Sequence, residues 1–221
     1  MSGTIAFCSR EDHVPPMFAA CLARLAARHP DAKLLHLIGN DIADQRNKAV
    51  LQSEGDWLWF IDTDMIFAPE ILERLLSHEV EFVQVLCMMR HPPHVPLLYE
   101  ENEFKRNLAP VGPPRLVEVK SLGAGGTLYR KVLFETIPHP WFEGVIGTED
   151  TNFAQKARQA GFKLYVDLAS PVGHLTPMIV WPHYADGIWS TRYDAMNGQS
   201  VLLPPLEPSR IVQPKPLHRI A

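Results

Sequence analysis

The chain has 221 residues and a net charge of −4 at pH 7, which is enough length for one large domain with a packed core. That charge excludes a broad electrostatic attraction for nucleic acid or anionic membranes, and no local basic patch is conspicuous. No apolar run reaches membrane-span length, and residues 1–4 lead into a strand rather than a signal peptide. The three cysteines lack metal-ligand spacing and are typical of reduced core thiols. We therefore expect a soluble, cytoplasmic protein.

Strands and helices alternate in the N-terminal part of the sequence. Apolar runs predict strands at 4–8, 33–38 and 57–61, with helices opening at 15 and spanning 41–53. This order predicts a doubly wound, right-handed parallel unit, whose ligands bind at the carboxyl ends of the strands. Neither a G-x-G-x-x-G nor a P-loop sequence follows any of these strands, so the sequence does not support those modes of phosphate binding.

The third strand carries the central motif of the chain. The run Trp57 to Ile61 is entirely apolar, as in a strand buried on both faces of a sheet, and Asp62-Thr63-Asp64 follows it directly. Two carboxylates one residue apart in a turn can converge on a divalent cation. They can equally solvate the turn and cap the next helix, which Pro69 opens. The motif alone leaves both interpretations open.

The second half of the chain is predicted to add further elements and two irregular segments. Strands are predicted at 82–89, 116–122 and 163–166, and helices at 69–78, 130–137 and 147–159. Prolines favour an extended loop at 91–96 and an irregular segment at 100–114. From residue 177 the composition predicts an aromatic-lined loop or lid, followed by a Pro-rich extended tail from 204 to 221.

Three further features have both a functional and a structural interpretation. Arg46 could bind a phosphate bidentately, although a surface arginine on a helix is the commoner case. Gly123 to Gly126 could let the backbone approach a ligand closely, or form a plain bulge. Glu149 and Asp150 open a predicted helix and could simply complement its dipole.

The order of these motifs resembles that of GT-A fold glycosyltransferases of the family-2-like branch. The resemblance covers roughly residues 4 to 175. It is carried by Arg46-Asn47, Asp62-Thr63-Asp64, Gly123 to Gly126, Pro140-Trp141-Phe142, Glu149-Asp150 and Gly173-His174. It implies an α/β GT-A fold: a single domain with a mostly parallel central sheet and a C-terminal extension. Its expected parts are a nucleotide-sugar half (1–90), an acceptor half (91–176) and the extension (177–221).

The resemblance also implies a nucleotide-diphosphate sugar donor, with a UDP-sugar favoured, held by Mn²⁺ or Mg²⁺. Asp64 would ligate the metal, Asp62 would bind the ribose or the metal through water, and His174 would be the third contact. Asp150 would be the general base for the acceptor hydroxyl, implying inversion at the anomeric carbon, and Glu149 would bind the acceptor or orient Asp150. The implied donor-binding residues are Cys8, Ser9, Arg10, Asp41, Arg46, Asp62, Thr63, Asp64, Gly125, Gly126 and Trp141.

Two other classes of protein share part of this pattern. In haloacid dehalogenase-like phosphatases a strand also ends in Asp-x-Asp, and the first acid is a nucleophile. Their usual threonine two positions further on is Ile66 here, and their acidic strand comes first in the chain rather than third. A non-catalytic sugar-nucleotide or glycan-binding protein is the second alternative. The acceptor stays open: a small molecule, a glycan, a protein or a hydroxylated DNA base.

Overall fold

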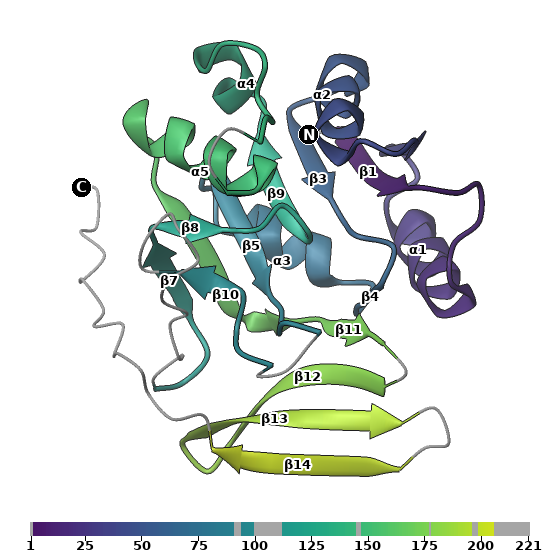
Figure 1. Cartoon of the computed structure of the whole chain (residues 1–221), viewed down its shortest axis with the longest axis vertical. Helices are drawn as coiled ribbons and strands as arrows, with labels where there is room; N and C mark the ends of the chain where they lie inside the picture. Colours follow the sequence, from purple (N-terminus) through teal and green to yellow (C-terminus); the bar gives the residue numbers. More distant parts are fainter. Residues whose placement is uncertain are drawn as a thin grey trace.

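The computed structural model describes residues 2–90, 94–99, 112–144, 147–176, 178–195 and 199–205. A seven-stranded sheet lies between two layers of helices, and a second sheet extends from one end of it (Figure 1). Three predicted irregular segments are only partly described: residues 91–93 of the loop 91–96, 100–111 of the segment 100–114 and 206–221 of the tail 204–221 fall outside the described residues.

The main sheet has the order β2-β1-β3-β9-β5-β10-β7. Five of its strands run in one direction: β1 (Gly3–Ser9), β2 (Lys33–Ile38), β3 (Trp57–Phe60), β5 (Phe82–Leu86) and β10 (Leu164–Pro171). The other two, β9 (Thr127–Arg130) and β7 (Leu116–Val119), run in the opposite direction. The predicted α/β architecture with a mostly parallel sheet is confirmed.

The helices cover both faces of this sheet. α1 (Pro16–Arg28) and α3 (Ile71–Ser77) pack on one face, whereas α2 (Ile42–Gln52), α4 (Val132–Thr136) and α5 (Glu149–Gln159) pack on the other. Each helix buries an apolar stripe against the sheet, which supplies most of the stability of a helix in a globular protein.

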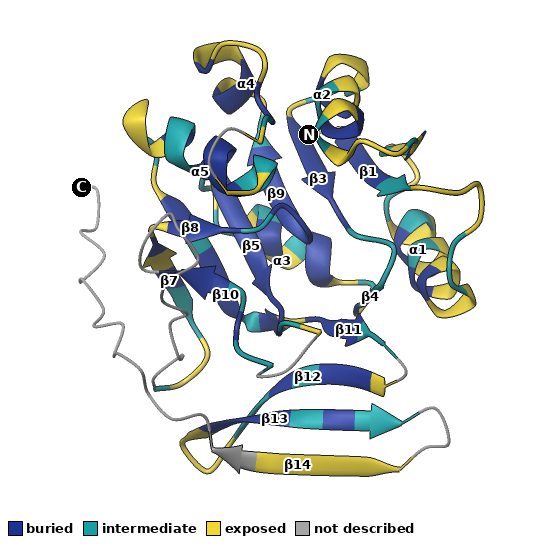
Figure 2. Ribbon diagram, in the orientation of Figure 1, coloured by how far each residue is buried: buried dark blue, intermediate teal, exposed yellow. Residues whose placement is uncertain are grey.

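β3 lies inside the sheet between β1 and β9, and the residues of the run 57–61 are all buried (Figure 2). Trp57, Trp59 and Ile61 pack with the α1 and α3 side, while Leu58 and Phe60 pack with the other. This alternation follows from the two-residue period of a strand. Both faces of β3 are therefore apolar, as the sequence predicts.

The segment after residue 177 differs from its prediction. Instead of an aromatic loop or lid, it forms β12 (Met178–Ala185), β13 (Ile188–Ala195) and β14 (Ser200–Pro205). They continue a second sheet in the order β14-β13-β12-β11-β4, together with β11 (Gly173–Leu175) and β4 (Met65–Ile66). Asp186 and Gly187 have positive φ at the tip of the β12–β13 hairpin, and Asp-Gly is a strong hairpin signal that the loop interpretation overlooked.

The predicted strand 116–122 is also different in the structure. It divides at Lys120 into β7 and β8 (Ser121–Leu122), and β8 pairs with β6 (Leu98–Tyr99) in a small sheet of its own. Other predicted boundaries lie within a few residues of the observed ones, except that β10 continues to Pro171. Among the described helices, none is long and apolar enough to cross a bilayer; the cytoplasmic location stays a prediction.

Asp167 connects α3 to β10 through a buried charge. Its side chain is fully buried and accepts hydrogen bonds from Arg74, from His78 at 3.0 Å and from the Ser170 hydroxyl at 2.7 Å. Desolvation favours the protonated acid, but these bonds outweigh it and hold the pKa of Asp167 well below its usual range. The carboxylate therefore stabilises the folded state only while it is ionised.

Replacing this acid should reveal that contribution. We expect Asp167→Asn to lower the free energy of unfolding by about 2–3 kcal/mol at pH 7, because charged hydrogen bonds are lost. Since the folded-state pKa is depressed, the wild type keeps this stability above pH ~4 and loses it as the pH falls further, so the difference shrinks in acid. Urea unfolding at several pH values measures it. Glu118→Gln, in an exposed ion pair with Lys163, is the control and should change little; equal losses in both variants would contradict the assignment.

Candidate active site

The site lies where β3 ends and a glycine loop approaches it. Asp62 follows β3, and the loop 123–126 precedes β9, the neighbouring strand. A Cβ added to Gly125 would lie 2.3 Å from Asp62 Oδ2, so any other residue there would push the Asp62 carboxylate from its position. Gly126 has φ of +71° and its Cβ would meet Val85 at 2.3 Å. The glycines are therefore needed for close approach rather than for a plain bulge.

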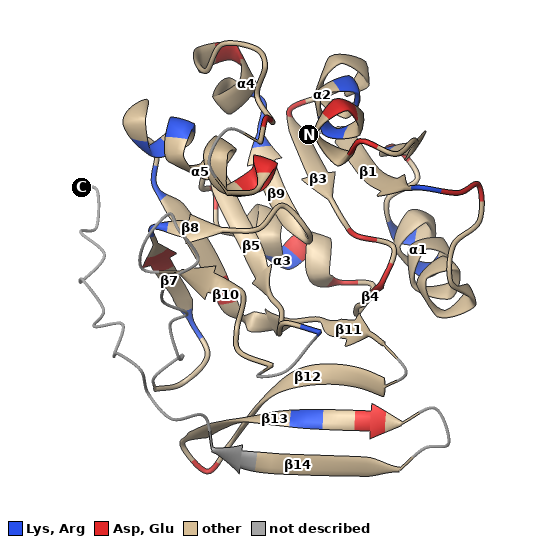
Figure 3. Cartoon of the chain, viewed as in Figure 1, with Lys and Arg blue, Asp and Glu red and all other residues tan. Residues whose placement is uncertain are grey.

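Arg46 joins the two acidic motifs of the chain. It is 5% exposed on α2 and lies beside the Phe60 ring. Its Nη2 lies 3.4 Å from Asp62 Oδ1, while its Nη1 donates to Glu149 Oε1 and lies 3.9 Å from Asp150 Oδ2. In Figure 3 the acids after β3 and those in the first turn of α5 appear as separate clusters. Arg46 is the cation that links them.

The three carboxylates around Arg46 carry more negative charge than the guanidinium neutralises. Desolvation raises the pKa of Asp62, Arg46 lowers it, and Asp64 raises it again, with a net increase. The pKa of Glu149 is raised in the same way, with Asp150 as the repelling neighbour. This excess of negative charge favours an additional cation at the site.

Asp150 is held at the start of α5 by hydrogen bonds to both of its oxygens. Oδ2 accepts from the backbone N–H of Ala124 at 3.1 Å. Oδ1 accepts from the Thr151 N–H at 2.7 Å and from the Thr148 hydroxyl. The carboxylate is thus oriented by backbone groups of both the glycine loop and the helix.

His174 contacts Asp64 because β4 pairs with β11. Their register places His174 opposite Met65, next to Asp64. Its Nε2 lies 3.2 Å from Asp64 Oδ2, which Arg90 also contacts, and its Nδ1 lies 2.8 Å from the Met88 carbonyl oxygen. Burial lowers the pKa of His174, but the hydrogen bonds with Asp64 and Cys87 outweigh it and raise the pKa to about 11. Despite desolvation, the same His174 contact lowers the pKa of Asp64.

The predicted metal ligands are only partly brought together. Within the described part of the chain, no three His, Cys, Asp or Glu side chains form a compact metal-binding group. Asp64 and His174 are in contact, whereas the Asp62 carboxylate is turned toward Arg46. The donor set still fits a divalent cation, because the Met88 carbonyl orients the His174 ring with Nε2 toward Asp64, as outer-shell carbonyls do for metal-ligating histidines.

One pocket of about 130 Å³ connects these groups. Carboxylates from both motifs and the imidazole line it: Asp62, Asp150 and His174. The remaining lining residues are Met65, Gln84, Leu97, Tyr99, Gly123, Gly125 and Thr148. The pocket therefore presents several hydrogen-bond acceptors to a single small ligand.

Comparison with known proteins shows what the chain is similar to. Residues 12–104 match the family model described as "Glycosyl transferase family 2". The structure of A197 from STIV is similar with a TM-score of 0.55 and 17% identity, over 97% of this chain and 99% of that one. This likeness supports the fold. Residues 12–104 are thus similar to glycosyltransferases of family 2. The fold of the chain is the predicted GT-A fold.

Other comparisons add little to this family match. Two structures of S. aureus TarS share 16% identity over 74% of this chain, with TM-scores of 0.49 and 0.48. The match covers 56% of one TarS chain and 34% of the other. No curated protein sequence matches. The family match includes Arg46 and the Asp62-Thr63-Asp64 motif but ends before Glu149, so it does not extend to the second acidic pair.

Several residues predicted to bind the donor lie outside this pocket. Ser9 bonds to His36 at 2.7 Å, Arg10 is exposed, and Asp41 caps α2 by accepting from backbone N–H groups. Cys8 is half-buried beyond the pocket lining, and burial raises the pKa of its thiol to about 12. Their place beside the nucleoside stays a prediction, as does a contact of Thr63 with the donor.

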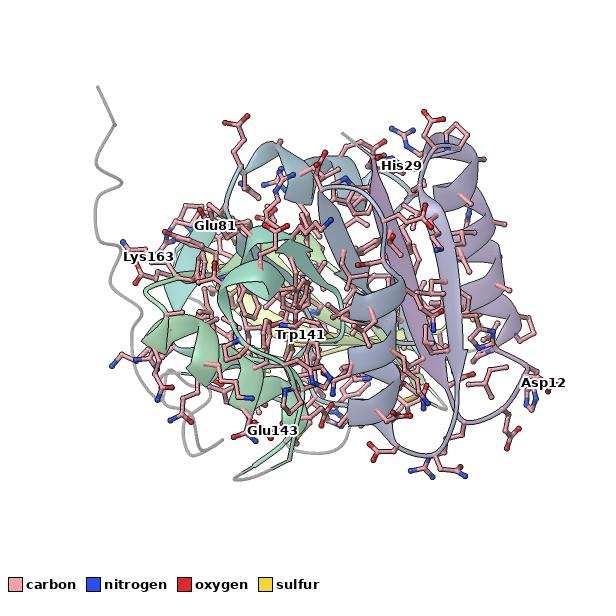
Figure 4. The ribbon with its side chains drawn as sticks, turned by 90° about the horizontal axis from the view of Figure 1, so that it is seen from above. Asp12, His29, Glu81, Trp141, Glu143 and Lys163 are labelled. Atoms are coloured by element: carbon pink, nitrogen blue, oxygen red, sulfur yellow. The ribbon has the colours of Figure 1, made fainter. Side chains whose placement is uncertain are left out.

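Trp141 has a structural position. Its indole Nε1 donates to the carbonyls of Phe134 at 3.1 Å and Ile137 at 2.8 Å, and Figure 4 places it in the crowded interior. It does not line the pocket. Asn47 binds the backbone of residues 141 and 142 with both ends of its amide, which fixes this loop to α2. The Arg46-Asn47 pair thus has an architectural role that the sequence did not reveal.

The glycine at position 125 offers a steric test of this geometry. We expect Gly125→Ala to destabilise the protein by about 1–3 kcal/mol, because the new methyl group overlaps Asp62 and Met65. Gly144→Ala is the matched control, since no atom of the described residues lies within 4 Å of its Cβ, and its effect should stay within about 0.5 kcal/mol. Chemical denaturation measures both; similar stabilities would contradict the close approach.

Proposed function

We propose that the protein is a glycosyltransferase that moves a sugar from a nucleotide-diphosphate sugar to an acceptor hydroxyl. A UDP-sugar is the favoured donor, and the transfer inverts the configuration of the anomeric carbon. The supporting observation is that Asp62 and Asp150, which come from the two acidic motifs, line one small pocket. Asp62 would belong to the donor side, and Asp150 would act as the base. The nucleoside would lie along the carboxyl ends of β1 and β2.

On the donor side, Asp64 and His174 would hold Mn²⁺ or Mg²⁺, with Asp62 beside them directly or through water. When bound, the ion stabilises the negative charge that develops on the departing phosphate oxygen. Arg46 lies next to Asp62 and adds positive charge at the same place. In the structure its guanidinium contacts carboxylates, so a direct phosphate contact is part of the proposal.

On the acceptor side, Asp150 would accept the proton of the attacking hydroxyl. As the acceptor oxygen bonds to the anomeric carbon, the bond from that carbon to the diphosphate oxygen breaks and the nucleoside diphosphate leaves. The N–H groups of Ala124 and Thr151 hold the carboxylate in place for this transfer. Glu149, which accepts from Arg46, would position Arg46 and thereby Asp150.

The donor class can be tested directly. Incubation with Mn²⁺ and a panel of UDP-, GDP- and TDP-sugars should release a nucleoside diphosphate from one group of donors, with UDP-sugars preferred. Phosphatase activity on phosphomonoesters with no turnover of any nucleotide sugar would contradict the proposal. A steep salt dependence of acceptor binding would indicate a nucleic-acid acceptor.

Asp64 should be needed for metal-dependent donor binding. We expect Asp64→Ala to weaken Mn²⁺-dependent UDP-sugar binding by about 100-fold, since a direct ligand and the partner of His174 are lost. Isothermal titration with and without Mn²⁺ measures this. Asp44→Ala, on the exposed side of α2, is the control and should bind normally. If Asp64→Ala lowered stability alone, the acid would have a purely structural role.

Asp150 should be needed for turnover but not for donor binding. We expect Asp150→Asn to reduce kcat by about 100-fold or more, because the amide cannot accept the proton but has nearly the same shape. Donor affinity should stay within about twofold. Steady-state kinetics together with donor titration separates the two effects. Unchanged turnover would refute Asp150 as the base.

A further inference from the structure

Gln84 is a buried polar residue whose side chain reaches the pocket from β5. It is 2% exposed and is one of the pocket-lining residues. Its Nε2 donates to the carbonyl oxygens of Gly123 at 3.1 Å and Gly125 at 3.0 Å. These two bonds secure the glycine loop, but they use only one end of the amide.

The other end of the amide has no protein partner. Both glycine carbonyls are acceptors, so the NH₂ group of Gln84 must face them and its orientation is determined. The opposite atom, Oε1, is buried and has no hydrogen-bond partner within the described ranges. A buried carbonyl oxygen without a donor is costly and uncommon. A ligand group that donates to it would remove this cost.

The position of Gln84 indicates which ligand group that is. A Cβ on Gly123 would lie 3.4 Å from Asp150 Oδ2 and 3.5 Å from Gln84 Nε2, so the amide and the proposed base flank the same residue. The pocket volume of about 130 Å³ is well below that of a typical site for a whole cofactor or nucleotide, so the pocket takes only one compact part of a larger ligand. Gln84 Oε1 and the carboxylates of Asp62 and Asp150 are all hydrogen-bond acceptors, which matches the several hydroxyl donors of a sugar ring.

We propose that Gln84 Oε1 accepts a hydrogen bond from a hydroxyl of the transferred sugar, which makes Gln84 a specificity-determining residue. This inference rests on the proposed function, because it requires a nucleotide-sugar donor. The amide would select donors that present a hydroxyl at this point, since a deoxy analogue would leave the oxygen unpaired. The nucleoside diphosphate part of the donor would not contact Gln84.

The test compares binding of UDP with binding of UDP-sugars in the presence of Mn²⁺. We expect Gln84→Met to weaken binding of the preferred UDP-sugar by about tenfold and to leave UDP affinity unchanged. For the deoxy analogue that lacks the recognised hydroxyl, wild type and variant should bind equally well. Gln84→Leu repeats the measurement if the methionine variant does not fold.

Thr127→Val is the matched control for loop support. The Thr127 hydroxyl donates to the same Gly123 carbonyl at 2.8 Å but is not part of the pocket lining. This variant should keep the affinity for both UDP and the UDP-sugar. A loss equal to that of Gln84→Met, or a Gln84 variant with unchanged sugar binding, would overturn the inference and leave the proposed function intact. If the wild type bound none of the UDP-, GDP- or TDP-sugars, the proposed function itself would fail.

Discussion

The buried guanidinium of Arg46 is the interaction on which the candidate site depends. It comes from α2, yet its partners follow β3 and begin α5, so one cation fixes the relative positions of three elements. A buried charge of this kind is tolerated only when it is paired. Here three acids share one base, so the negative charge is in excess. The surplus negative charge is what makes the pocket suited to a cation and to hydroxyl donors.

The buried apolar strand that positions the site could be predicted from the sequence. The uninterrupted run from Trp57 to Ile61 requires burial on both faces, and that requirement places β3 inside a sheet with helices on both sides. The acids after it then fall at the sheet edge where ligands bind. The hairpin of β12 and β13 could equally be predicted from Asp186-Gly187, but its scattered aromatic residues favoured a loop. The Asp-Gly turn signal predicts the structure of this segment better than its aromatic composition does.

The partners within the site were not predictable from local pattern. Arg46 and Glu149 are 103 positions apart, and only the placement of α2 and α5 on the same face of the sheet brings them together. Gln84 sits in an apolar strand, where a single polar residue gives no sign of its role. Its importance depends on the glycine carbonyls and on the oxygen they leave unpaired. Whether a buried polar group has a hydrogen-bond partner can be seen only in the tertiary structure.

The short pairing of β4 with β11 connects the acidic turn to the second sheet. The residue pairs Gly173 with Ile66 and His174 with Met65 join the two strands. The backbone N–H of Leu175 also donates to the carbonyl oxygen of Asp64, which directly precedes β4, at 2.6 Å. The strands β12–β14 therefore extend the same hydrogen-bonded sheet that fixes the separation of Asp64 and His174.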